Sequence, residues 1–342
     1  MPFTPGFNRS EALELLQFCA IIENGVAPPI PTGPPAGWTS VFTSPVIGPF
    51  DNLWQLWRRT ADGAFAVAVR GTTMNAGSIL EDLIAVMITA KGSLQLGPVQ
   101  FDYKFADDPL ADVHLGFALG ALLLLKDPTN GILSQLAKNG VGAGSHVYIT
   151  GHSQGAAVAT LIRSYLEYNA GVLSQVAYKT YVYAQPKPGD DHYAEDFESR
   201  FCNSDLAFRI TNSLDWVPQV PFTIEFVTDI NKPNPLSVLA AMPLTLAILQ
   251  KAVDQVKVVG EAHAHARLLS AAASVAMTGT HAPTLGALKA AAPFAPTLNY
   301  VNAGTEIALI GVPCVGDECK DAFFEHHAST YYGLLEKQIP SA

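Results

Sequence analysis

Short apolar segments alternate along this chain with longer segments of helical periodicity. Five short apolar segments predict strands, at residues 64–70, 147–149, 180–184, 207–211 and 306–312. Helical patterns cover residues 9–23, 113–125, 156–168 and 322–337, and the second of these begins as the end of a strand. Strands that alternate with helices predict a mainly parallel sheet with helices on both faces.

Three regions depart from this alternation. Residues 25–49 are rich in proline and glycine and predict an N-terminal segment that wraps over the domain surface. Residues 78–88 have apolar positions at helical spacing and predict a short amphipathic helix. Residues 223–300 are rich in alanine and leucine, interrupted by prolines, and predict an inserted helical cap. We therefore expect one domain over residues 1–342 that carries this helix and this cap.

The segment Gly151-His152-Ser153-Gln154-Gly155 joins a predicted strand to a predicted helix. The two glycines permit a sharp turn, because a β-carbon at either position would crowd the neighbouring strand or helix. Ser153 at the tip would be accessible to a substrate carbonyl. The start of the helix would direct backbone N–H groups at the place where negative charge develops during acyl transfer. The segment therefore predicts a nucleophilic serine.

A nucleophilic serine needs a histidine base, and the histidine needs a carboxylate that fixes its tautomer. Asp215 is the best candidate acid, because it follows a predicted strand whose carboxyl end faces the same edge as the serine turn. Asp205 is the rival acid. The adjacent pair His326 and His327 near the C-terminus supplies the candidate base. The other downstream histidines are in the predicted cap, at positions 263, 265 and 281.

Five blocks in this order resemble the class 3, or fungal-type, triacylglycerol lipases of the α/β-hydrolase superfamily. The blocks are residues 69–72 (VRGT), 113–117 (VHLGF), 151–155 (GHSQG), 183–190 (YAQPKPGD) and 212–218 (NSLDWVP). The resemblance spans about residues 60–222 plus the terminal histidine. It implies the α/β-hydrolase fold, Ser153 as nucleophile and Asp215 as the orienting acid. It also implies that Thr72 and Gln154 form the oxyanion hole, and that residues 78–88 are a lid helix.

The chain departs from the fungal members of this family between the acid and the histidine, where 111 residues separate Asp215 from His326. This length leaves the role of the cap, and the substrate preference, open. Residues 325–332 resemble the family's histidine with a tyrosine a few positions later. Two histidines and two tyrosines leave the register open between His326 and His327, and a spacing of five residues favours His326.

The composition limits the remaining functions. The chain has 342 residues, 49% of them hydrophobic, and a formal net charge of −10. It has no basic stripe, so we expect no nucleic-acid partner. No apolar run reaches the roughly 18 residues of a membrane span, and no signal peptide is visible. A secreted and a cytoplasmic location both stay open. Cys314 and Cys319 could form a disulfide, or all four cysteines could be reduced.

Several polar residues outside the expected site predict ordinary structural roles. His114 lies on an apolar segment and is expected to be a core histidine. His263 and His265 are two residues apart, which on a helix makes a poor metal pair. The acidic pairs 107–108 and 190–191 lack the ligand spacing of a calcium loop and predict solvated turns. We expect neither a metal nor an organic cofactor.

Together these features predict a serine ester hydrolase, foremost a lipase that acts on acylglycerol or other fatty-acyl esters, at a lipid–water interface if the lid opens there. Alternatives within the same chemistry are an esterase of feruloyl, aryl or short-chain esters, a phospholipase, and an acyltransferase. An alternative of a different class is a lipase-fold binding protein without catalysis.

Overall fold

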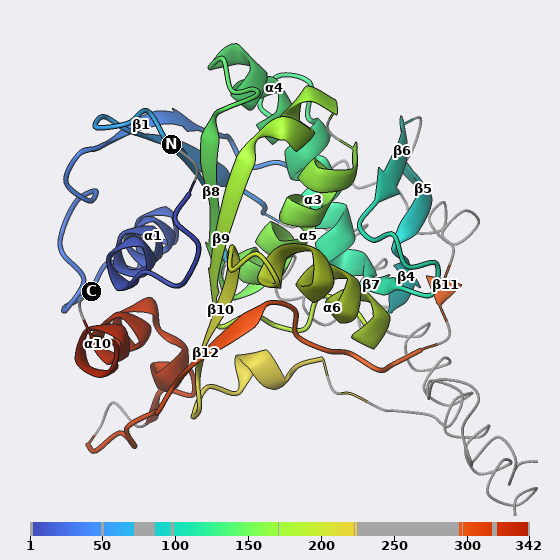
Figure 1. Cartoon of the computed structure of the whole chain (residues 1–342). Helices are drawn as coiled ribbons and strands as arrows, with labels where there is room; N and C mark the ends of the chain where they lie inside the picture. Colours follow the sequence, from blue (N-terminus) through green and yellow to red (C-terminus); the bar gives the residue numbers. More distant parts are fainter. Residues whose placement is uncertain are drawn as a thin grey trace, which may run out of the picture.

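The central sheet has seven strands in the order β1-β2-β3-β8-β9-β10-β12 (Figure 1). The computed structural model describes residues 3–48, 51–71, 86–96, 99–169, 171–221, 223, 294–295, 297–316 and 320–340. The five strands from β3 to β12 are parallel, and β2 and β1 extend this edge in antiparallel pairing. The strands are β1 (Trp38–Thr43), β2 (Trp54–Arg59), β3 (Phe65–Val69), β8 (His146–His152), β9 (Ala177–Tyr183), β10 (Ala207–Asn212) and β12 (Thr305–Leu309).

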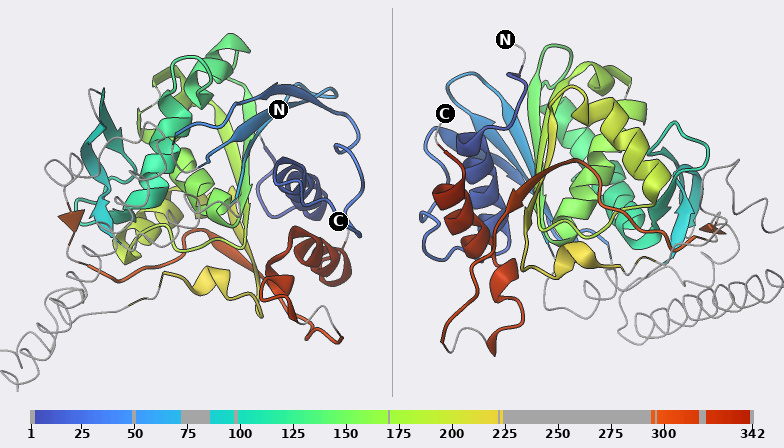
Figure 2. Two further views of the ribbon diagram at one scale, coloured as in Figure 1. Left: turned by 180° about the vertical axis from the view of Figure 1, so that it is seen from behind. Right: turned by 60° about the horizontal axis from the view of Figure 1, so that its bottom comes forward.

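Helices cover both faces of this sheet (Figures 1 and 2). One face carries α3 (Leu115–Lys126), α5 (Gln154–Asn169) and α6 (Asp191–Phe197), and the other carries α1 (Arg9–Ile22) and α10 (Ala328–Gln338). The remaining helical segments are α4 (Ile132–Lys138), η1 (Gly171–Gln175), η2 (Glu198–Cys202), η3 (Val217–Gln219) and η5 (Phe324–His326).

Strand β3 shows why the sheet needs two helical layers. Its side chains alternate between faces, so that Phe65 and Val67 join the core under α3 and α5, while Ala66 and Ala68 join the core under α1 and α10. All five residues of the strand are buried. A mainly parallel sheet buried on both faces is an α/β arrangement of the kind that the α/β-hydrolase fold has, and this part of the sequence prediction is confirmed.

The carboxyl ends of the parallel strands meet at one edge of the sheet. The serine turn follows β8, the loop with Asp215 follows β10, and the segment after β12 leads to η5 (Figure 1). Residues distant in sequence are thereby brought to the same edge, which is where open α/β sheets bind their ligands.

Two smaller sheets lie beside α3, and of their strands only the strand end at Val113, in β7, was predicted. One pairs β4 (Met87–Thr89) with β7 (Asp112–His114) and β11 (Phe294–Ala295), and the other is the hairpin β5 (Lys91–Leu96) and β6 (Val99–Lys104). Met87 and Ile88 are therefore in a strand, which corrects the prediction that the helix extends to Ile88. The strand at 294–295 likewise corrects the helical reading of the end of the cap. Residues 78–85 and 224–293 lie outside the described residues, so the lid helix and the cap stay predictions.

The predicted surface wrap at residues 25–49 contains strand β1, which sequence analysis missed. Trp38 pairs with Arg59 in β2, and the register shifts between Ser40 and Phe42. Only Trp38 of this strand is buried, because β1 is the outer strand of the sheet. An edge strand with a single buried residue leaves almost no apolar alternation in the sequence.

Within the described part of the chain, no helix has both the length and the apolar character that a membrane crossing requires. Cys19 and Cys202 are free thiols, and Cys314 is in a disulfide. This corrects the alternative of four reduced cysteines. Cys319 lies outside the described residues.

Candidate active site

The serine turn has the strained geometry that its two glycines predict. Strand β8 ends at His152, helix α5 begins at Gln154, and Ser153 between them has a φ of 57°. A β-carbon on Gly151 would lie 2.1 Å from the carbonyl oxygen of Gly155, and one on Gly155 would lie 2.5 Å from the carbonyl oxygen of Val69. Only glycine fits at either position, and the tight turn directs Ser153 away from the strand.

Ser153, His326 and Asp215 form a continuous hydrogen-bonded chain. Nε2 of His326 is 2.8 Å from Oγ of Ser153, and Nδ1 of His326 is 2.8 Å from Oδ2 of Asp215. Because the carboxylate can only accept, Nδ1 carries the proton and Nε2 is left to accept from the serine hydroxyl. All three residues are buried, with at most 8% of the surface of any one exposed.

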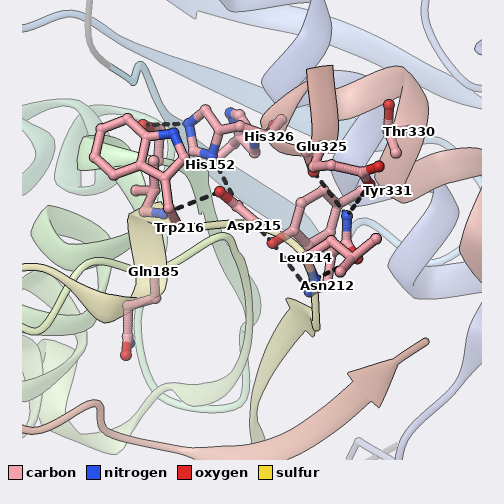
Figure 3. A network of polar contacts seen from close by, with 12 residues as sticks. His152, Gln185, Asn212, Leu214, Asp215, Trp216, Glu325, His326, Thr330 and Tyr331 are labelled. Atoms are coloured by element: carbon pink, nitrogen blue, oxygen red, sulfur yellow. Dashed lines mark hydrogen bonds and ion pairs between the residues drawn. The ribbon is translucent and has the colours of Figure 1, made fainter. Parts of the chain in front are cut away.

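Asp215 is fixed by three groups (Figure 3). Besides His326, the hydroxyl of Tyr331 donates to Oδ2 at 2.8 Å and the backbone N–H of Val217 donates to Oδ1 at 3.0 Å. The Tyr331 hydroxyl in turn accepts from the backbone N–H of Asn212 at 3.1 Å. The tyrosine five residues after His326 thus fixes the Asp215 side chain, which is a physical reason for the spacing noted in the sequence.

Burial controls the protonation of His326. Desolvation lowers its pKa below the ordinary histidine value, the hydrogen bond to Asp215 raises it, and the nearby His152 lowers it again. The net effect is a lowered pKa. His326 is therefore unprotonated at neutral pH, which is the state a base requires.

The second candidate base lies elsewhere. His327 is half exposed, and its Nε2 is 2.7 Å from Oδ2 of Asp321 on the surface. It also occupies the position before the first residue of α10. The rival acid Asp205 is in a turn before β10, where its backbone N–H donates to Cys202 and its φ is 55°.

Of the two predicted oxyanion-hole residues, only Gln154 is among the described residues. Gln154 is buried and is the first residue of α5, where backbone N–H groups are directed along the helix axis toward its N-terminal end. Thr72 lies outside the described residues, and only Gly71 before it is described. Its role stays a prediction.

His114 is a core histidine, as predicted. It is fully buried, its Nδ1 accepts from the backbone N–H of Phe117, and burial lowers its pKa to about 3. Asp190 corrects the prediction of a solvated turn. It is buried at the start of α6, accepts from the N–H groups of Asp112 and Tyr193, and burial raises its pKa to about 7.

Among the described residues, no group of three or more His, Cys, Asp or Glu side chains could hold a metal ion. His263 and His265 lie outside those residues.

Two polar groups beside Ser153, Asp215 and His326 were not predicted from the sequence. His152, within the serine turn, contacts both Glu23 and the main chain of His326. Glu23 follows the last residue of α1. No sequence signal connects Glu23 to His152, because 129 residues separate them and helix α1 was predicted without a role at the site.

Two comparisons with known proteins found matches to this chain. Residues 66–225 match the family model described as lipase (class 3). A search of curated proteins found no match. Solved structures similar to this chain include the triacylglyceride lipase of Rhizomucor miehei, with 20% identity, 62% of this chain and 72% of that chain covered, and a TM-score of 0.40. Lipase II of Rhizopus niveus has 18% identity, covers 62% of this chain and 72% of that chain, and has a TM-score of 0.43. Residues 66–225, just under half of the chain, thus match the class 3 lipase family, and this match indicates an ester hydrolase.

Proposed function

We propose that this ester hydrolase is a lipase that cleaves acylglycerols or other fatty-acyl esters, with Ser153 as nucleophile, His326 as base and Asp215 as orienting acid. The observation that carries the proposal is the pair of 2.8 Å contacts that His326 makes, to the serine hydroxyl through Nε2 and to the carboxylate through Nδ1. These are hydrogen-bond distances at which a proton can pass from serine to imidazole without rearrangement.

The reaction follows from these contacts. Nε2 of His326 accepts the Ser153 proton while Oγ attacks the ester carbonyl, and Asp215 stabilises the imidazolium that forms. The backbone N–H groups of Gln154 and Thr72 stabilise the tetrahedral oxyanion, with the Thr72 hydroxyl assisting. His326 then protonates the leaving alcohol, and an acyl-enzyme on Ser153 remains. Water then attacks the acyl carbon while His326 accepts a proton from it, and His326 returns this proton to Oγ of Ser153 as the acid leaves.

The surroundings of the site favour an apolar acyl group. Trp216 follows Asp215 and is 43% exposed, and Phe323 precedes η5 and is 41% exposed. Their ring centroids are 5.4 Å apart, and the Phe323 ring is 6.0 Å from that of His326. The neighbouring Leu214 is 44% exposed. Exposed apolar side chains beside a catalytic group can receive a hydrocarbon chain or contact a lipid surface.

The first experiment tests the nucleophile. Ser153→Ala should reduce kcat for p-nitrophenyl esters by about 10⁴- to 10⁶-fold, and a fluorophosphonate probe should label the wild-type protein at Ser153 only. Ser174→Ala, an exposed serine in η1, is the matched control and should retain full activity. Near-full activity of Ser153→Ala would end the proposal. An unlabelled, inactive wild-type protein would indicate the binding-protein alternative.

The second experiment tests the substrate class. Rates are compared for p-nitrophenyl esters of rising chain length, an emulsified triglyceride, a phospholipid and methyl ferulate, with and without an acceptor alcohol. A lipase should prefer long chains and the emulsion. A preference for methyl ferulate or for the shortest ester would identify the esterase alternative, and transfer to the alcohol would identify an acyltransferase.

A third pair of variants tests the base. His326→Ala should abolish turnover, because Ser153 then has no proton acceptor within hydrogen-bond distance among the described residues. His327→Ala should retain most of the activity, since among the described residues its side chain binds the exposed Asp321 and not Ser153. The reverse result would transfer the role of base to His327.

A further inference from the structure

His152 lies between the proposed catalytic histidine and a carboxylate from the opposite end of the chain (Figure 3 shows its contact with His326). Its Nε2 is 2.8 Å from the main-chain carbonyl oxygen of His326. Its Nδ1 is 3.1 Å from Oε2 of Glu23 and 3.3 Å from Oε1. The side chain is buried, with 4% of its surface exposed. Both ring nitrogens therefore have a protein partner.

Both of these partners are hydrogen-bond acceptors. A carbonyl oxygen cannot donate, and an ionised carboxylate cannot donate either. With Glu23 ionised, both nitrogens of His152 must carry protons, and the ring is an imidazolium. Burial by itself lowers the pKa of His152. The charge and hydrogen bond of Glu23, the hydrogen bond to the main chain of His326 and the charge of Asp215 together outweigh burial and raise this pKa above the ordinary value.

Glu23 also fixes the loop that leads to Thr72. Its Oε1 accepts from the backbone N–H of Gly71 at 3.2 Å. The contact is close, because a β-carbon on Gly71 would lie 2.5 Å from Oε1 of Glu23 and 2.7 Å from the carbonyl oxygen of His152. One carboxylate at the end of α1 thus joins the loop after β3, the serine turn and, through His152, the segment that carries His326.

We propose that Glu23 and His152 form a partly buried carboxylate–imidazolium pair that positions His326 and, through the positive charge beside it, opposes protonation of the His326 ring. The inference rests on the proposed function, in which His326 is the base. The two imidazole rings are 4.6 Å apart between centroids, with an angle of 35° between their planes. Glu23 binds the nitrogen of His152 that faces away from His326. The positive charge of His152 is therefore nearer to the His326 ring than the negative charge of Glu23.

Other ionisable groups face this pair. Asp215 acts on both histidines through its charge, and the ring of Tyr331 is 6.0 Å from that of His152. Cys19 on α1 is fully buried, and burial together with the charge of Glu23 raises the pKa of its thiol, so it stays neutral. Asp215 and its hydrogen bonds are unchanged by a substitution at Glu23. A change at Glu23 therefore reports on the pair itself.

Glu23→Gln separates charge from geometry. The glutamine oxygen can still accept from Gly71, and its amide can donate to Nδ1 of a neutral His152, whose Nε2–H still binds His326. The substitution removes the positive charge of His152, which repels a protonated His326, and the negative charge of Glu23, which attracts it. The lost repulsion is larger than the lost attraction. We therefore expect the acid limb of the kcat/KM profile to move to higher pH, with KM nearly unchanged.

Glu23→Ala removes the charge and also the acceptor for Gly71. We expect kcat to fall by a further factor of roughly 10 to 100, the cost of a displacement of about 1 Å in a catalytic group. The matched control is Asp321→Asn. It neutralises the carboxylate of the exposed His327–Asp321 pair, and the asparagine oxygen can still accept from the N–H of Phe323. Its pH profile should match that of the wild-type protein.

Nuclear magnetic resonance titration of the ¹⁵N-labelled histidines provides a readout that does not depend on activity, with the two signals assigned through His152→Gln and His326→Ala. In the wild-type protein, the midpoint of His152 should lie above about 6.5 and that of His326 below it. In Glu23→Gln, the first midpoint should fall and the second should rise. A His152 midpoint at or below about 6.5 in the wild-type protein would overturn the proposal, and this test holds even if the variants fail to fold. Coincident pH profiles of the wild-type protein and Glu23→Gln would also overturn it. Activity retained by Ser153→Ala would instead overturn the proposed function and leave the ionisation of His152 as measured.

Discussion

Tyr331→Phe removes one hydroxyl and leaves a fully buried ring in place. That hydroxyl donates to Oδ2 of Asp215 at 2.8 Å and accepts from the backbone N–H of Asn212 at 3.1 Å. The substitution therefore opens no large cavity. It deletes two hydrogen bonds, one of them to a carboxylate, and leaves a buried N–H group without its partner.

The magnitude follows from these two contacts. A hydrogen bond to a charged group contributes about 1.5–3 kcal/mol, and a buried N–H group left unsatisfied costs about 1–3 kcal/mol. Since the surroundings relax in part, we expect the free energy of unfolding to fall by about 2–4 kcal/mol. Asp215 keeps its contacts with His326 and with the N–H of Val217, so kcat should fall by less than about tenfold. Stability should thus suffer more than turnover.

Urea unfolding, with p-nitrophenyl ester hydrolysis under the same buffer conditions, measures both quantities. Tyr332→Phe is the matched control, because the Tyr332 side chain is also largely buried but its hydroxyl makes no hydrogen bond to any residue in the described part of the chain. It should change the unfolding free energy by less than about 0.5 kcal/mol. Equal losses in the two variants would show that the Tyr331 hydroxyl contributes nothing through Asp215 and Asn212, and would refute the reasoning.

Glu11→Gln should destabilise the protein by about 3–5 kcal/mol in urea unfolding, because it leaves the buried ammonium of Lys179 without the carboxylate 2.7 Å away; a loss below about 1 kcal/mol would contradict this. Gly155→Ala should cost at least about 2 kcal/mol and most of the activity, since its β-carbon would lie 2.7 Å from the carbonyl oxygen of Arg70. An active, equally stable variant would refute the close approach. For the wild-type protein, kcat/KM should fall on acidification with a midpoint below 6.5, because burial lowers the pKa of His326 and only the neutral ring accepts the serine proton. A midpoint at or above 6.5 would contradict this.

The apolar pattern predicted those elements of the fold that are buried on both sides. Strand β3 is buried along its whole length and α3 along most of its length, so each appears in the sequence as a continuous apolar run. Strand β6 (VQFDYK) alternates apolar and polar residues, a strand pattern that was not used in the prediction. Strand β1, by contrast, has one buried residue. Such strands are held by backbone pairing, which leaves little trace in the side chains.

The sequence could predict those residues of the candidate site that directly follow parallel strands. Ser153 and Asp215 follow parallel strands, whose carboxyl ends must share one edge of the sheet. His326 does not follow a strand directly. Its distinction from His327 depended on the tyrosine five residues later, and the physical content of that spacing is the hydrogen bond from Tyr331 to Asp215. Thr72 stays a prediction, because it rests on the resemblance alone.

Glu23 could not be assigned to the site from sequence, and the reason is structural. An acidic residue at the end of a helix predicts nothing beyond the end of the helix, and here it is unfavourable to the helix dipole. The carboxylate is offset by two donors that other elements supply, the Nδ1–H of His152 and the backbone N–H of Gly71, and by the positive charge of the imidazolium. Those elements meet only because α1 packs on the sheet face across from α5, so the pair exists only after the fold has formed. Glu23 lies at an unfavourable end of its own helix dipole, and its contacts with the site account for a carboxylate at this position. The shift of the pH profile in Glu23→Gln measures how strongly the site depends on it.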